Sequence, residues 1–381
     1  MPYQEFKQPL ELWVNEDLVL PECRPSFLLM HETLRESNPE LEYWNLLREI
    51  LPKIVKVHRF KNLKEAGSLV ITPNDYRDYL GKPQKNALDK FKKEVLDSGR
   101  KLITFTPGME YQPEPGELAF ATSVYQLPDE KLIPMPTWLY DLRTKISAIP
   151  KPPMPTIGFV GNTRYPGRIS SLAGRVPLPQ TAKSWLASSR FVNQNISLGA
   201  RRGIGRLVRT KVLQVAQADP RLDTQIIART GDYFLMTPAE KQRARAEYIQ
   251  HIQDNAYTIC MRGDNNDNYQ MYEVMSAGRI PILIDTNLQR PTLKNSKWED
   301  FCVIVPFQEI HRLGEIVADF HRQLSPEDFL AVCQKSRAAF EELLPHNFVF
   351  QILQEIANHI DRDLMPIGTS NKNQMPLTLG Q

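Results

Sequence analysis

The clearest pattern in the chain is an alternation of short apolar runs with segments whose apolar residues recur at helical spacing. Apolar runs bounded by Gly, Pro, Asn or Asp predict buried strands, and the 3.6-residue periodicity predicts amphipathic helices. The predicted strands are Pro25 to Met30, Ser68 to Thr72, Lys101 to Thr106, Leu118 to Val124, Thr156 to Val160, Thr224 to Ala228, Tyr257 to Met261, Ile280 to Ile284 and Cys302 to Val305. Predicted helices include Leu41 to Val57, Pro83 to Leu96, Ile204 to Ala216, Thr237 to Asn255 and Asn347 to Leu364. Such alternation predicts an α/β fold with parallel sheets and right-handed crossovers.

A proline cluster divides the chain. Pro150, Pro152, Pro153 and Pro155 lie within six residues and predict a stiff, extended linker. We therefore expect one domain over residues 1–150 and a second over 156–345. The polar residues 367–381 predict a disordered tail.

Composition is that of an ordinary globular protein, with 381 residues of which 41% are hydrophobic and 24% charged. The formal charge of +3 is too small to indicate a nucleic-acid partner. One local basic cluster, Arg201 to Lys211, could meet phosphate. Because no aromatic residues interleave with its charges, we interpret it as a solvated helix face and expect no nucleic-acid binding.

The cysteines stand singly, without the spacing of a metal or redox motif, and are expected to be reduced thiols. They are Cys23, Cys260, Cys302 and Cys333. The first residues lack an apolar signal core, and no 18-residue apolar run occurs. We therefore expect a cytoplasmic protein without a transmembrane segment, which leaves peripheral membrane association open.

The stretch from Tyr257 to Asp285 carries the most chemistry. A buried strand leads into a polar loop, Asp267 and Gln270 fit a capping box, and a short helix is expected to begin near Asn268. Gly278 then provides a left-handed stop before the next strand. In an open α/β sheet such a loop lies at the carboxyl end of a strand, where ligands bind, and the helix N-terminus favours an anion.

Two side chains in this stretch suit a sugar nucleotide. Arg262 can contact phosphate, and Glu273 can accept two hydrogen bonds from a vicinal diol. The alternative is a salt bridge between them that ties loop to helix. Gly161 and Asn162, at another strand exit, would let a ligand approach the backbone closely.

The order of motifs over Tyr257 to Pro291 is strand, Arg-Gly, polar loop, a helix ending in Glu, a small residue with Gly, and a strand containing Ile-Pro. These appear as Met261-Arg262-Gly263, Asn268 to Glu273, Ala277 to Pro281 and Ile284 to Thr286. Trp298 to Phe301 and Thr156 to Asn162 fit the same order. The stretch resembles the core signature of exostosin-like glycosyltransferases, family 47, and their bacterial relatives.

That resemblance implies a GT-B architecture, in which two Rossmann-like domains with parallel sheets face a central cleft. Residues 1–150 would bind the acceptor, 156–345 the nucleotide sugar, and a helix over 346–366 would cross back to the N-terminal domain. The implied reaction, typical of polysaccharide biosynthesis, transfers a hexosyl or pentosyl group from a nucleoside-diphosphate sugar to a hydroxyl of a glycan or other acceptor, with inversion. No metal or other cofactor is required.

The resemblance implies a set of donor-binding residues. They are Arg262, Gly263, Asn268, Gln270, Glu273, Gly161, Asn162 and Arg229. Two of them depart from the signature, because Asn268 and Gln270 stand where the family has Ser and Arg. The charge for the diphosphate would then come from Arg262, Arg279, Arg168, Arg229 or the helix dipole. Alternatively Gln270 only caps Asp267, and the chain is a catalytically inactive relative that binds sugar nucleotides or glycans.

An inverting transfer needs a general base, which in a GT-B cleft usually comes from the N-terminal domain. The candidates are His31, Asp75 and Glu110, each at a predicted strand exit, and Asp75 ranks first. The alternative for each is an ordinary loop cap or surface acid.

Overall fold

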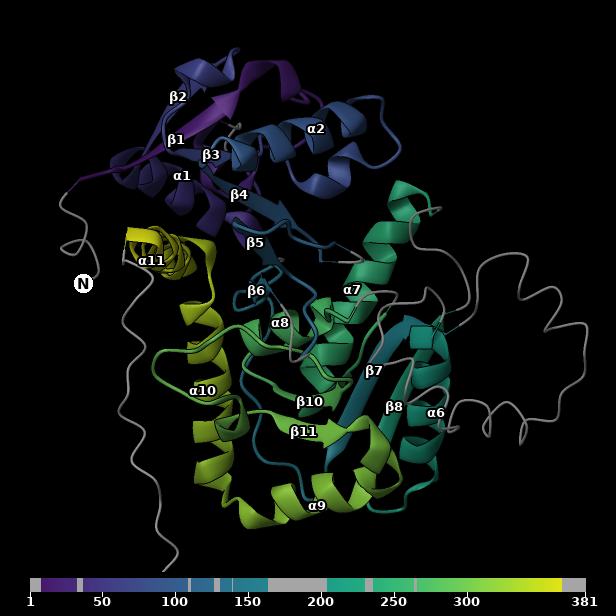
Figure 1. Cartoon of the computed structure of the whole chain (residues 1–381). Helices are drawn as coiled ribbons and strands as arrows, with labels where there is room; N and C mark the ends of the chain where they lie inside the picture. Colours follow the sequence, from purple (N-terminus) through teal and green to yellow (C-terminus); the bar gives the residue numbers. More distant parts are fainter. Residues whose placement is uncertain are drawn as a thin grey trace, which may run out of the picture.

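The computed structural model describes residues 8–32, 37–108, 111–126, 131–138, 140–163, 204–229, 236–263 and 266–364 (Figure 1). Their strands form two sheets, and every strand pair in both sheets is parallel. The predicted α/β class with parallel sheets is confirmed.

The first sheet has the strand order β2-β1-β3-β4-β5-β6. Its strands are β1 (Leu10–Asn15), β2 (Val55–Phe60), β3 (Leu69–Ile71), β4 (Lys101–Thr106), β5 (Glu117–Ala121) and β6 (Leu132–Pro134). The three residues of β3 and the five of β5 are all buried, as expected for central strands of a parallel sheet covered on both faces. Helices α1 (Tyr43–Ile54) and α2 (Gln84–Asp97) belong to this half.

Sequence reasoning was wrong at the start of this half. The predicted strand from Pro25 to Met30 is a 3-10 helix, η2 (Phe27–Glu32), whereas β1 and β2 are not among the predicted strands. A short, fully buried apolar run has no periodicity that separates strand from helix. The strand β2 was hidden because it follows α1 directly, and the predicted helix from Leu41 to Val57 extends into it.

The second sheet has the order β11-β10-β9-β7-β8. Its strands are β7 (Thr156–Asn162), β8 (Asp223–Arg229), β9 (Tyr257–Cys260), β10 (Ile280–Asp285) and β11 (Val303–Pro306). The helices of this half are α6 (Ile204–Ala218), α7 (Pro238–Asp254), α8 (Tyr269–Ser276), α9 (Leu313–Gln323) and α10 (Pro326–Glu342). The predicted start of α7 is confirmed, since Thr237 and Glu240 form a reciprocal capping box.

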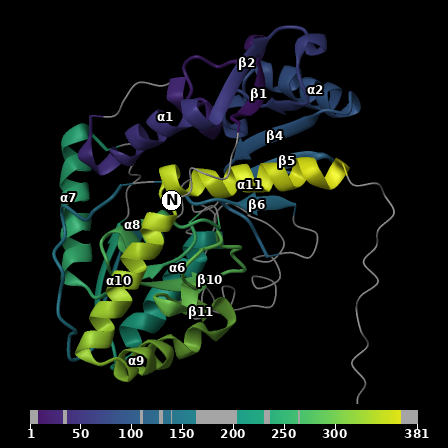
Figure 2. The ribbon, with the colours of Figure 1, turned by 90° about the vertical axis from the view of Figure 1, so that its left-hand side faces the viewer.

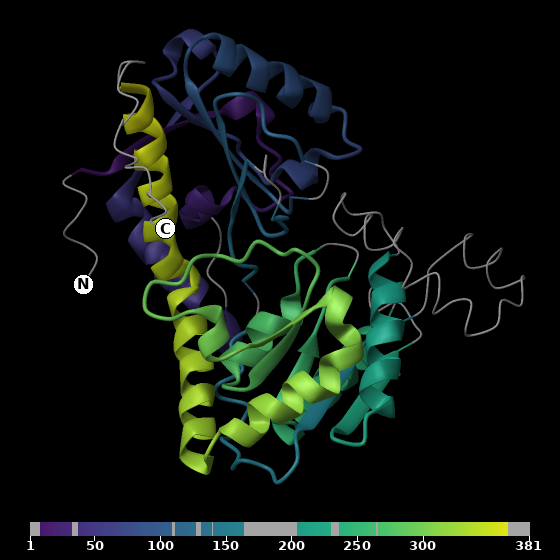
Figure 3. The same ribbon diagram turned by 60° about the horizontal axis from the view of Figure 1, so that its bottom comes forward.

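The last helix, α11 (Pro345–Leu364), leaves the second half and packs against α1 of the first (Figure 2). Trp138 and Phe348 meet edge to face with ring centroids 6.2 Å apart, and His359 Nε2 lies 3.3 Å from the carbonyl oxygen of Gly116. Figure 3 shows α10 and α11 following one another up the side of the molecule. Two parallel sheets with a last helix that returns to the first half are the GT-B architecture that the resemblance implied.

Candidate functional site

The N-terminus of α8 lies at the carboxyl edge of the second sheet, one residue later than predicted. Asn268 is the N-cap, and its Oδ1 accepts a hydrogen bond from the backbone N–H of Met271 at 3.3 Å. The predicted capping box of Asp267 and Gln270 is therefore wrong, because Gln270 falls at the second helical position. The predicted stop is confirmed, since Gly278 has φ of 61°.

Gln270 instead connects α8 to the neighbouring strand. Its Nε2 donates a hydrogen bond to the backbone carbonyl of Val160, near the end of β7. The amide that replaces the arginine of the signature thus fixes α8 against β7. This contact explains the amide at position 270 without assigning it to a ligand.

Glu273 is buried on α8 and has a partner that sequence reasoning missed. Arg245 of α7 donates from Nη1 to Oε1 of Glu273 at 2.7 Å and from Nη2 to Oε2 of Glu40 at 3.2 Å. The sequence left open a salt bridge between Glu273 and Arg262. The structure instead pairs Glu273 with Arg245. The arginine joins an acid of the first half to an acid of the second.

Aromatic rings hold the Arg245 guanidinium in place. Its central carbon lies 4.4 Å from the ring centroid of Tyr140 and 5.5 Å from that of Tyr248. Burial raises the pKa of Glu273, while the positive charge of Arg245 opposes that rise. Arg245 therefore favours the ionised carboxylate, which is the form that accepts hydrogen bonds from a diol.

Arg262 follows β9 and is only 2% exposed. Its guanidinium carbon lies 5.9 Å from the ring centroid of Tyr125, in the segment after β5. Burial raises the pKa of the Tyr125 hydroxyl, and the charge of Arg262 opposes this. Arg262 therefore sits beneath a residue of the first half at the point where the two halves meet.

Arg209 on α6 reaches the same strand ends. Its Nη1 donates to the carbonyl oxygen of Asn162 at 2.9 Å, and its Nε donates to that of Arg262 at 3.1 Å. Arg209 is half-buried, so the interpretation of its basic cluster as a solvated face does not hold for this residue. The cluster itself was the signal in the sequence, but nothing in it indicated which arginine turns inward.

Gly161, Asn162 and Arg229 end the paired strands β7 and β8. Arg229 turns away toward α7, where its Nη2 donates to the carbonyl oxygen of Ala244 at 2.8 Å and to Oε2 of Glu247 at 2.6 Å. The end of β7 thus lies beside Gln270, which contacts the Val160 carbonyl, and beside Arg209, which contacts the Asn162 carbonyl. The Arg229 guanidinium is engaged elsewhere.

The two halves meet through backbone pairing beside Arg262. The N–H of Gln126 donates to the carbonyl of Asn287, and that of Gln289 donates to the carbonyl of Val124, both at 2.9 Å. The N–H of Asn266 also donates to Oγ of Ser123 at 2.9 Å. The carboxyl ends of β5 and β10 are therefore joined across the interface.

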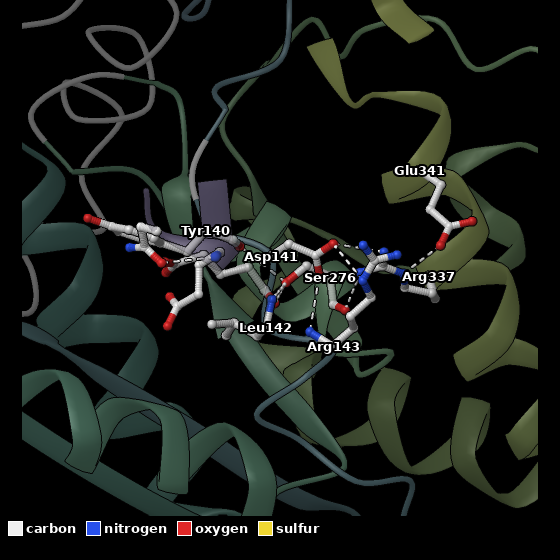
Figure 4. A network of polar contacts seen from close by, with 10 residues as sticks. Tyr140, Asp141, Leu142, Arg143, Ser276, Arg337 and Glu341 are labelled. Atoms are coloured by element: carbon white, nitrogen blue, oxygen red, sulfur yellow. Dashed lines mark hydrogen bonds and ion pairs between the residues drawn. The ribbon is translucent and has the colours of Figure 1, made fainter. Parts of the chain in front are cut away.

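A second polar network fixes the segment that connects the halves (Figure 4). Arg337 of α10 forms a bidentate pair with Asp141, at 2.6 and 3.0 Å, and donates to the carbonyl of Ser276 at 2.7 Å. The backbone N–H of Leu142 donates to Oγ of Ser276 at 3.0 Å. The connecting segment is thus anchored to both α8 and α10.

Of the candidate bases, Asp75 follows β3 at the carboxyl edge of the first sheet. It caps η5 (Tyr76–Tyr79) by accepting a hydrogen bond from the N–H of Arg77 at 2.9 Å, so the capping role is real. Burial raises its pKa to about 7. Burial raises the pKa of Tyr269 on α8, and the charge of Arg77 opposes this rise, which indicates that this loop lies near the second half.

The other two candidates are placed differently. His31 is half-buried in η2, which packs on α1, rather than at the end of a strand. Glu110 lies outside the described residues, as does Arg168.

Within the described part of the chain, no group of three or more His, Cys, Asp or Glu side chains is arranged to hold a metal ion. Among the helices of these ranges, none has the length and apolar character needed to cross a membrane.

One protein-family model matches the part of the chain that contains α8 and its neighbouring strands. Residues 207–303, from the first turn of α6 to the start of β11, match the model described as RXYLT1 C-terminal domain. No curated protein matches the chain.

Solved structures that resemble the chain are distant. They include HepE of Anabaena in complex with UDP and glucose (8% identity, 93% of this chain and 99% of that one, TM-score 0.34) and sucrose-phosphate synthase of Thermosynechococcus elongatus (10%, 93% and 100%, 0.37). An alpha1,3-fucosyltransferase with GDP-fucose shares 13% identity over 90% of each chain, with a TM-score of 0.34. At such TM-scores no residue's role carries over.

Proposed function

We propose that the chain is an inverting glycosyltransferase that takes a hexosyl or pentosyl group from a nucleoside-diphosphate sugar and places it on an acceptor hydroxyl. The observation that carries the proposal is the buried Glu273, which Arg245 favours in its ionised form, on the helix that leaves the ligand-binding edge of the second sheet. The glycosyltransferase-like signature lies on these same elements. The family-model match covers them as well.

The residues divide the chemistry between the two halves. Glu273 would accept hydrogen bonds from the ribose diol, and the N-terminus of α8 with Arg262 would favour the diphosphate. Asp75, whose pKa of about 7 suits a base near neutral pH, would take the proton of the acceptor hydroxyl. The hydroxyl oxygen then bonds to the anomeric carbon from the face opposite the leaving group, and the nucleoside diphosphate leaves with the bonding electrons.

One observation favours a second candidate, a relative that binds sugar nucleotides or glycans without catalysis. Gln270 replaces the arginine of the signature and is engaged with the carbonyl of Val160. If no other cation takes over, the leaving diphosphate lacks charge stabilisation and transfer would be slow.

A thermal-shift screen of UDP, GDP, ADP and dTDP with their sugars tests the proposal. A ligand present at 100 times its Kd adds about 2.7 kcal/mol to the free energy of unfolding, which is easily measured. Stabilisation by one nucleotide together with donor hydrolysis or sugar transfer supports the enzyme. Stabilisation without either reaction supports the binding protein, and no stabilisation by any nucleotide contradicts both.

A further inference from the structure

The replacement of an arginine by Gln270 raises the question of which cation meets the diphosphate. The structure removes two arginines from consideration. Arg279 lies at the start of β10, away from the carboxyl edge, and donates to the carbonyls of Ile252, Ser147 and Gln253. Arg229 is engaged with α7.

Arg262 remains at the correct edge but is almost completely buried under Tyr125. Arg209 stands at the same edge and is more exposed. The Nη1 of Arg209 bonds to the carbonyl of Asn162, two residues beyond the Val160 carbonyl that Gln270 contacts on β7. Arg209 therefore lies at the same strand end as the residue that replaces the missing arginine.

Glycines allow this approach of α6 to the loop after β9. A Cβ atom on Gly205 would lie 1.8 Å from the carbonyl oxygen of Gly263, so the first turn of α6 touches the loop backbone. A Cβ atom on Gly263 would lie 3.2 Å from Nη2 of Arg209. A larger residue at position 263 would therefore crowd the guanidinium.

We propose that Arg209 supplies the positive charge to the diphosphate of the donor, in place of the arginine that the chain lacks at position 270. This inference rests on the proposed function. Hydrogen bonds from Nε and Nη1 of Arg209 to two backbone carbonyls fix the guanidinium plane where the ends of β7 and β9 meet α6. Its Nη2 lies beside Gly263. Because arginine stays protonated at physiological pH, its charge is available to a phosphate throughout.

The test compares a diphosphate with its nucleoside, because only the diphosphate needs Arg209. The probe is whichever of UDP, GDP, ADP and dTDP stabilises the wild type most, together with the corresponding nucleoside, both measured by calorimetric titration. We expect Arg209→Gln to lower the affinity for the diphosphate by about 10- to 100-fold, as for loss of charge-assisted hydrogen bonds. The affinity for the nucleoside should fall by less than about twofold. Arg209→Lys should recover part of the diphosphate affinity, because it keeps the charge.

Arg221→Gln is the matched control. Arg221 lies beyond the C-terminal end of α6, is paired with Asp219, and its loss removes the same formal charge. The control should bind both probes as the wild type does. Equal weakening of diphosphate and nucleoside by Arg209→Gln would show a purely structural clamp and overturn the inference, as would unchanged affinity. A wild type that binds no nucleotide would instead contradict the proposed function.

Discussion

Arg245 Nη1 lies 2.7 Å from Glu273 Oε1, and this contact connects the candidate donor site to the first half of the chain through Glu40. The pair sits between α7 and α8, with the guanidinium over two tyrosine rings. A buried carboxylate that loses its cation keeps the cost of desolvation without the compensating charge. We therefore expect the pair to affect both stability and ligand binding.

Loss of this cation should make stability depend more steeply on pH. Arg245→Gln is expected to lower the free energy of unfolding by roughly 2 kcal/mol at neutral pH. Because the pKa of Glu273 is already raised by burial and would rise further, the deficit should be small at pH 5 and grow as the pH increases. Urea denaturation at pH 5 and pH 8 measures it. Arg243→Gln, an exposed arginine on the same helix, is the control, and a deficit that does not change with pH would contradict the prediction.

Removal of the Glu273 charge should weaken nucleotide binding without unfolding the chain. Glu273→Gln keeps the shape and an oxygen that accepts from Arg245, so the melting temperature should fall only slightly. Affinity for the best nucleotide of the screen should fall by about tenfold, the effect of one charge-assisted hydrogen bond of about 1.4 kcal/mol. Titration calorimetry decides, and unchanged affinity would remove Glu273 from the site.

The raised pKa of Asp75 predicts opposite effects of pH on stability and on activity. Its pKa rises from 3.8 to about 7 on folding, so between these values the folded state holds a proton that the unfolded state has lost. Stability relative to Asp75→Asn should therefore fall as the pH rises from about 4 to about 7, and level off above, with a slope of at most about 1.4 kcal/mol per pH unit.

Activity should follow the ionised form. If Asp75 is the general base, kcat/KM rises with pH through about 7, and Asp75→Asn, which keeps the cap on Arg77, loses transfer but retains nucleotide binding. A variant with wild-type turnover would show that Asp75 only caps its loop.

The bidentate Asp141–Arg337 pair should contribute to the free energy of unfolding, because it holds the connecting segment in place. Arg337→Gln removes three hydrogen bonds to Asp141 and Ser276 and should cost roughly 3 kcal/mol, because both partners are largely buried. Arg322→Gln removes an exposed pair with Asp319 on α9 and should cost less than about 0.5 kcal/mol. Equal costs in chemical denaturation would mean that the Asp141 pair is no stronger than a surface pair.

A buried pair in the first half offers a test by double substitution. Lys92 Nζ lies 3.2 Å from Glu117 Oε1, and both side chains are almost fully buried. Lys92→Met should cost roughly 3 to 5 kcal/mol, because it leaves the acid without its cation. Adding Glu117→Leu should cost clearly less than the sum of the two single changes, and strict additivity would contradict the coupling.

The sequence by itself determined the fold class and the strand, loop and helix that carry the candidate donor residues. Apolar runs and stop signals are local, so β9, α8, Gly278 and β10 were predicted within a residue or two. The motif order from Tyr257 to Pro291 likewise depends only on neighbours in the chain.

Only the tertiary structure decided which charges meet. Arg245 and Glu273 lie 28 positions apart, and Arg209 lies 53 from the Arg262 carbonyl that it contacts. Neither distance leaves a periodic trace in the sequence. A polar contact between separate elements depends on how helices pack on the sheet, and that packing is set by the whole apolar core. The N-cap of α8 was predicted wrongly for the same reason. Gln270 donates to a carbonyl of β7 and does not cap its own helix.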